Sequence, residues 1–220
     1  GLGQGRLHET RNLQAAMAEC SVWSHTLNRP DELPQVMARA FGIFNSERPG
    51  PVHITIPLNV ITADASHVSL QTWPLPSKAA PEASQLAEAA ELLNLAKNPV
   101  LILGGGAAGA AESILKLANT LAAPVTTTHN AKGLLPVDHP LYVGGSPSQQ
   151  ASVDLFHKAD VILAIGTEFS ETDYDFFLTG AFDIGPAKVI RVDIDRAQLS
   201  CNIQPHLAIQ ADAKLFATAL

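Results

Sequence analysis

The sequence predicts an α/β fold in which a Rossmann-like, doubly wound parallel sheet follows a partial α/β domain. Two observations lead to this prediction. From about residue 81 onward, short apolar runs alternate with stretches of helical length, and the runs are continuously apolar, as strands covered on both faces are. Before that point only one short β-rich run is evident, so the first part of the chain does not form a complete sheet by itself.

Composition narrows the class of protein. The chain has 220 residues, 46% of them hydrophobic, and a formal net charge of −7 without any basic run, which argues against a nucleic-acid partner. No stretch reaches the roughly 18 apolar residues of a membrane span, so we expect a cytoplasmic protein without membrane contact. Cys20 and Cys201 lack the spacing of a zinc site or disulfide framework, so we expect no metal site and two buried or half-buried thiols.

The first third of the chain contains two helical patterns, about residues 13–22 and 32–45, and one strand, Val52–Ile56, bounded by prolines. Because this strand has no evident partner, we expect it to pair with other strands of a larger protein or with a second copy of the chain. A stretch rich in Ser, Thr and Pro follows. We therefore divide the chain into a partial domain at 1–62, a linker at 63–80 and a complete domain at 81–220.

The complete domain alternates regularly between the two kinds of element. Helices are expected at about 82–96, 110–121 and 149–158 and from Asp212, and strands at 100–103, 124–128, 161–165, 189–194 and 207–210. Short links between alternating strands and helices imply a parallel sheet with right-handed crossovers.

A glycine fingerprint, GGGAAG at Gly104–Gly109, lies between the first of these strands and the next helix. Two interpretations remain open. The glycines form a cradle for a nucleotide pyrophosphate at the carboxyl end of the sheet, or they permit a tight turn with close backbone packing. NAD is disfavoured, because the region after the second strand, PVTTTHNAKG, lacks the acid that binds the ribose, and the carboxylates of Asp193 and Asp195 follow a later strand.

Catalytic motifs are scarce in this sequence. We find no G-x-S-x-G, H-E-x-x-H or P-loop pattern. The segment TEFSETDYD has four acids, Glu168, Glu171, Asp173 and Asp175, which form either a solvated face or, less simply, a general acid and base pair.

The order of motifs resembles the thiamine-diphosphate-dependent enzymes of the acetolactate synthase, 2-oxoacid decarboxylase and carboligase group. The resemblance rests on RPGPVHITIPLNV, on NPVLILGGGAAGAAESILKLANTLAAPVTTTHNAKGLLPVDHPLYVGG, on ADVILAIGTEF and on KVIRVDIDRAQLSCNIQPHLAIQADAK, and it covers nearly the whole chain. It implies that residues 1–62 are the C-terminal part of a pyrimidine-binding domain and that 81–220 are the central domain. It also implies that this chain contacts the remainder of the parent enzyme, and that the parent enzyme is a homodimer or homotetramer.

In this family, thiamine diphosphate and Mg²⁺ carry the chemistry on 2-oxo acids, and the protein supplies positioning. The resemblance places the catalytic glutamate before residue 1 and the GDG motif of the diphosphate site in a third domain, and the 220 residues contain no GDG. We therefore expect a piece of a larger enzyme that is inactive by itself. Only the segment around His8 resembles one that approaches the active site, and a surface histidine before a helix is the simpler interpretation.

The central domain of this family holds FAD in some members, ADP in others and no ligand in the rest. The positions that correspond to FAD contacts are Gly104, Gly105, Gly106, Thr128, His129, Asn130, Gly166, Thr167, Asp193 and Asp212. This chain has Gly145, Ser146 and Pro147 where FAD-binding members have Met-His-Gly, and Glu168 and Thr172 where they have arginines. Acids repel a pyrophosphate, so we expect no tightly bound FAD.

The sequence thus favours a structural, non-catalytic central domain that positions catalytic domains and supports oligomers. An adenine-nucleotide or FAD-binding module is the alternative.

Overall fold

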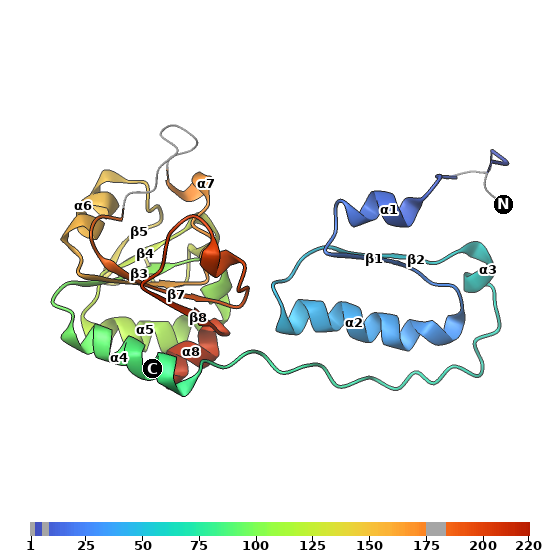
Figure 1. Cartoon of the computed structure of the whole chain (residues 1–220), viewed down its shortest axis with the longest axis horizontal. Coiled ribbons are helices and arrows are strands. Elements are labelled where there is room, and N and C mark those ends of the chain that lie inside the picture. The colour runs from blue at the N-terminus through green and yellow to red at the C-terminus, as the bar shows by residue number, and fades with distance from the viewer. Residues whose placement is uncertain (1–2, 6–8, 175–183) are drawn as a thin grey trace. The chain divides into compact units, whose positions relative to one another are not determined.

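The computed structural model describes residues 3–5, 9–174 and 184–220, which form two compact units, Gly1–Lys78 and Ala79–Leu220 (Figure 1). His8 and Asp175 lie outside the described residues. None of the helices within these ranges is both long and apolar enough to cross a membrane.

The larger unit is built on a six-stranded, fully parallel sheet with the order β5-β4-β3-β6-β7-β8. Its strands are β3 (Pro99–Leu103), β4 (Val125–Thr127), β5 (Tyr142–Gly144), β6 (Val161–Ile165), β7 (Lys188–Asp193) and β8 (Leu207–Gln210). The chain runs outward from β3 to β5, returns to β6 and then runs outward to β8. The strand order therefore reverses between β3 and β6, which confirms the predicted doubly wound sheet.

Helices cover both faces of this sheet. They are α4 (Ala83–Leu95), α5 (Ala111–Leu121), α6 (Gln150–Lys158), α7 (Glu171–Tyr174) and α8 (Ala213–Ala219), with 3₁₀ turns η2 (Gly105–Ala110), η3 (His129–Ala131) and η4 (Gln198–Ser200). The helices α4, α5 and α8 lie on one side of the sheet, and α6 lies on the other (Figure 1).

The strand β3 shows why the strands are continuously apolar. Leu101 and Leu103 belong to the core cluster that includes Phe216 of α8, whereas Val100 and Ile102 belong to the cluster around Phe156 of α6. Successive side chains point to opposite faces of a sheet. Since both faces are covered, every position of β3 after Pro99 is buried.

The smaller unit contains a two-stranded parallel sheet of β1 (Trp23–Thr26) and β2 (Val52–Thr55), paired from Trp23 opposite Val52 to Thr26 opposite Thr55. The expectation that the strand at Val52 has no partner within this chain was therefore wrong. Its helical elements are α1 (Leu13–Ala18), η1 (Pro30–Glu32), α2 (Leu33–Ser46) and α3 (Leu58–Ile61). The first helix ends four residues earlier than expected, because the chain turns at 19–22 into β1.

The core of the smaller unit is slight. Leu27, Val36 and Val60 form its buried cluster, and every residue of both strands is only half-buried. The linker contacts this unit at Pro76, whose carbonyl oxygen accepts a hydrogen bond from Asn45 Nδ2 at 3.2 Å.

At the amino-terminal edge of the large sheet, the Asp160 carboxylate, which precedes β6, is hydrogen-bonded to the loop that precedes β3. It accepts hydrogen bonds from the backbone N–H groups of Lys97 at 2.6 Å and Asn98 at 3.0 Å. Partial desolvation of Asp160 raises its pKa, but hydrogen bonds from backbone N–H groups, those of Lys97 and Asn98 foremost, outweigh this effect and hold the pKa below 3.8.

A carboxyl group whose pKa is lowered by folding stabilises the fold above its unfolded-state pKa, and that contribution is lost as the pH falls through the folded-state pKa. Asp160→Asn should therefore reduce the free energy of unfolding more at pH 7 than at pH 3, as measured by urea unfolding. Asp154→Asn, which changes an exposed carboxylate on α6, is the matched control. An equal loss for Asp160→Asn at both pH values would contradict this explanation.

Candidate functional site

The loops that follow β3, β4, β6 and β7 meet at the carboxyl edge of the large sheet. The first amides after β3, β4 and β6 continue the hydrogen-bond ladder of the sheet: Gly104 N donates to Ile165 O at 2.9 Å, Thr128 N to Leu103 O at 2.8 Å and Gly166 N to Val192 O at 2.8 Å. The structure thus brings together nine of the ten residues predicted as cofactor contacts. The tenth, Asp212, follows β8 and begins α8.

The glycine fingerprint packs directly against the backbone of Gly166. Gly106 N donates a hydrogen bond to Gly166 O at 3.1 Å. A Cβ atom on Gly104 would lie 2.0 Å from Gly166 O, and one on Gly106 would lie 3.0 Å from Gly166 Cα. Gly166 itself has a φ of +62°, and its Cβ would lie 2.7 Å from the backbone of Gly106. The glycines thus have a structural purpose, since no side chain fits between these two loops.

The backbone amides of this loop are largely engaged within the protein. Gly104 N and Gly106 N donate to the β6 side, and Ala107 N donates to Gly104 O at 3.0 Å. From Gly105 onward the fingerprint itself forms the 3₁₀ turn η2, and the α-helix α5 begins only at Ala111. A phosphate cradle needs amides at a helix N-terminus that point toward the ligand. The observed loop therefore fits the close-packing interpretation better than the pyrophosphate interpretation.

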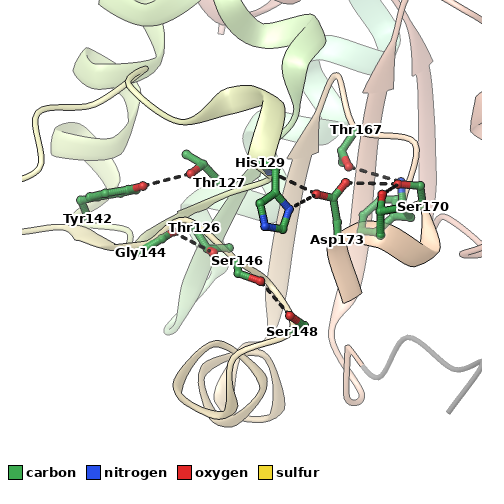
Figure 2. Close-up of polar contacts among 12 residues, drawn as sticks. Thr126, Thr127, His129, Tyr142, Gly144, Ser146, Ser148, Thr167, Ser170 and Asp173 are labelled. Atoms are coloured by element: carbon green, nitrogen blue, oxygen red, sulfur yellow. Dashed lines mark hydrogen bonds and ion pairs between the residues drawn. The ribbon is translucent and has the colours of Figure 1, made fainter. Parts of the chain in front are cut away.

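The loop after β4 is bonded to the acidic segment that follows β6. The carboxylate atom Asp173 Oδ1 lies 3.1 Å from the backbone N and 3.1 Å from Nδ1 of His129, and Ser170 Oγ donates to Asp173 Oδ2 at 3.2 Å. Figure 2 shows the imidazole turned toward this carboxylate, with Ser170 on the opposite side of Asp173. Asp173 is therefore not simply part of a solvated acidic face.

The loop after β6 is also bonded on its β7 side. Arg191, a residue of β7 that is 1% exposed, donates to the carbonyl oxygens of Thr167, Cys201 and Ile203. Its guanidinium carbon lies 4.8 Å from the centre of the Phe169 ring, a cation–π arrangement. Sequence reasoning missed Arg191, although an arginine flanked by apolar residues in the middle of the strand KVIRVD was a usable signal.

The predicted aspartates have local structural roles. Asp193 Oδ1 accepts from Asp195 N at 2.9 Å, and Asp212 Oδ1 caps α8 by accepting from Lys214 N at 3.0 Å and Leu215 N at 3.1 Å. A capping aspartate satisfies amides that a helix leaves unpaired. These contacts explain both residues without a ligand.

No group of three or more His, Cys, Asp or Glu side chains suited to a metal ion occurs within 3–5, 9–174 and 184–220. Cys20 and Cys201 are both free and exposed, so the expectation of buried or half-buried thiols was wrong. Each lies in a surface turn outside the regular elements.

Comparison with known proteins identifies the class. Residues 86–220 match the family described as "Thiamine pyrophosphate enzyme, central domain". The chain belongs to this family, and its larger unit is the central domain of a thiamine-pyrophosphate-dependent enzyme of the acetolactate synthase and decarboxylase group. The resemblance drawn from the sequence is confirmed.

Three relatives illustrate the similarity. A probable 2-ketoarginine decarboxylase of Pseudomonas aeruginosa is 39% identical over all of this chain and 39% of its own length. The acetolactate synthase isozyme 1 large subunit of Escherichia coli is 42% identical over 83% of this chain and 32% of its own length. A solved putative thiamin diphosphate-dependent enzyme of Mycobacterium smegmatis matches 90% of this chain and 38% of its own, with a TM-score of 0.72 and 25% identity. This chain therefore spans about two fifths or less of each relative.

The close packing at the sheet edge predicts that Gly104→Ala destabilises the larger unit. The added methyl group must displace the backbone of Gly166 and Thr167, and overpacking of this kind costs about 1–3 kcal/mol. Gly109→Ala is the matched control in the same fingerprint, because its Cβ would meet no atom within 4 Å. Urea unfolding should show a loss of stability for Gly104→Ala alone, and equal effects of the two substitutions would contradict the packing explanation.

Proposed function

We propose that this chain is the structural, non-catalytic central domain, together with part of the pyrimidine-binding domain, of a thiamine-diphosphate-dependent enzyme that acts on a 2-oxo acid. The observation that carries this proposal is the contact of Gly104 and Gly106 with Gly166. In this contact the glycine fingerprint, a motif suited to nucleotide binding, serves backbone packing. The domain then holds the catalytic domains in position and supports the oligomer.

The names of the relatives support the substrate class. An acetolactate synthase and a 2-ketoarginine decarboxylase both fit an enzyme of 2-oxo acids. We assign thiamine diphosphate and Mg²⁺ to other parts of the enzyme, because the residues present do not fit that pair: the sequence has no GDG, and no metal-binding cluster of three side chains occurs among the described residues.

The exposed apolar side chains of the smaller unit support contact with the remainder of the enzyme. Phe41 and Phe44 of α2 are 51% and 45% exposed and pack edge to face with ring centres 6.0 Å apart. Leu58 of α3 is 83% exposed. Exposed apolar clusters of this kind favour burial against another surface, which we assign to the rest of the parent enzyme in a homodimer or homotetramer.

The alternative, an adenine-nucleotide or FAD-binding module, has less support. Its amide donors at Gly106 and Ala107 are engaged within the protein, and Asp173 brings a carboxylate to the amide of His129. A negative charge at this edge opposes a pyrophosphate.

The assignment of the chemistry to other domains predicts that this 220-residue chain neither binds thiamine diphosphate with Mg²⁺ nor decarboxylates pyruvate. Titration calorimetry with both cofactors and an assay of carbon dioxide release are the measurements. Saturable binding of the cofactor, or turnover above the rate without protein, would contradict the assignment of the chemistry to other domains.

The electrostatic explanation predicts weak FAD binding that arginines improve. Each charge-assisted bond contributes about 1.5–3 kcal/mol, so Glu168→Arg combined with Thr172→Arg should tighten FAD binding by at least about tenfold, one factor of ten being about 1.4 kcal/mol. Fluorescence titration of FAD measures this. The matched control is Glu88→Arg combined with Thr120→Arg, which makes the same charge change at exposed positions of α4 and α5 and should leave FAD affinity unchanged. Equal affinities of the two double variants would refute the explanation.

A further inference from the structure

The segment that follows β6, residues 166–174, is bonded to both sides of the sheet edge, and we name it the β6 loop. On the β7 side it is held at its backbone. Arg191 donates to Thr167 O at 3.3 Å, and Asn202 Nδ2 donates to Glu168 O at 2.9 Å and Phe169 O at 3.0 Å. The Arg191 bond is buried, where a hydrogen bond is stronger than in water, whereas the two Asn202 bonds are more exposed.

Phe169 marks the point where this anchored part ends. Its side chain is 3% exposed and its φ is +54°, in the left-handed region that residues other than glycine seldom adopt. The carbonyl bond from Asn202 and the contact with Arg191 hold it there. Such a conformation persists only where the surroundings fix it, so Phe169 is a defined fixed point of the loop.

On the β4 side, Asp173 holds the loop through its contacts with His129. Ser170 O accepts a hydrogen bond from Asp173 N at 3.0 Å, and Ser170 Oγ bonds the other carboxylate oxygen, so the turn presents Asp173 toward His129. The side chains of Asp173 and His129 are 15% and 41% exposed. This contact is therefore far more open to water than the contacts of Arg191.

The strand order shows which strand the contact between Asp173 and His129 spans. Since β3 lies between β4 and β6, a bond from the β6 loop to His129 passes over the carboxyl end of β3 and its Gly104–Gly106 loop. Figure 2 shows Asp173 reaching from the segment that contains Ser170 to His129 across this edge.

We propose that residues 170–174 form a strap over the carboxyl end of β3, anchored on the β7 side through Arg191 and Asn202 and latched on the β4 side by Asp173 and His129. The strap opens by breaking the latch while the sheet and the anchor remain folded. This proposal is independent of whether the chain serves a thiamine-diphosphate enzyme.

Hydrogen–deuterium exchange of the full chain tests the strap. Asp173→Ala removes the acceptor of both His129 bonds, so exchange at the amide of residue 129 should accelerate about tenfold. His129→Ala removes only the imidazole bond and should accelerate it less. Glu171→Gln, an exposed carboxylate of the same helix, is the matched control and should leave exchange unchanged.

The same experiment separates a strap from a general loss of stability. Amides of β3 and β6 should keep their wild-type exchange rates in Asp173→Ala, and the urea midpoint should not shift. Unchanged exchange at residue 129 would overturn the proposal, and so would equal acceleration at residue 129 and in the two strands.

Discussion

The backbone contact between Gly104, Gly106 and Gly166 fixes the arrangement of the sheet's carboxyl edge. The two central strands, β3 and β6, end side by side, and the loops that leave them approach so closely that a Cβ on Gly104 would lie 2.0 Å from Gly166 O. Interiors this tightly packed admit little adjustment. The contact therefore determines where the β6 loop goes next and which groups it brings toward the neighbouring strands.

The rest of the edge follows from that position. Once Gly166 has turned the chain with its positive φ, Thr167 and Phe169 come within reach of the Arg191 guanidinium, and Asp173 comes within reach of His129. Burying a cation is costly unless polar groups surround it, and three carbonyl oxygens with an aromatic ring supply such surroundings. A motif that in other proteins holds a phosphate here forms part of a bonded framework.

Sequence reasoning succeeded where a local pattern has one physical cause. The continuously apolar runs at 100–103 and 161–165 predicted strands covered on both faces, and both are central strands. It failed at β1, because Trp23–Thr26 is short, half-buried and mostly polar, and at the three-residue strand β5.

The contacts of the site were beyond prediction for a different reason. The pairing of Asp173 with His129 depends on which loops meet in three dimensions, and the sequence of either loop alone does not contain that information. Likewise, GGGAAG suits both a phosphate and a close backbone neighbour, and only the position of Gly166 distinguishes these uses.

The most direct test of the account is an inventory of what the purified chain carries. The protein is denatured, and the supernatant is analysed by visible absorption for flavin and by mass spectrometry for adenine nucleotides. A sheet edge occupied by its own backbone and by Asp173 predicts no flavin and only substoichiometric nucleotide. One equivalent of FAD or ADP per chain would contradict the claim that the glycines serve packing.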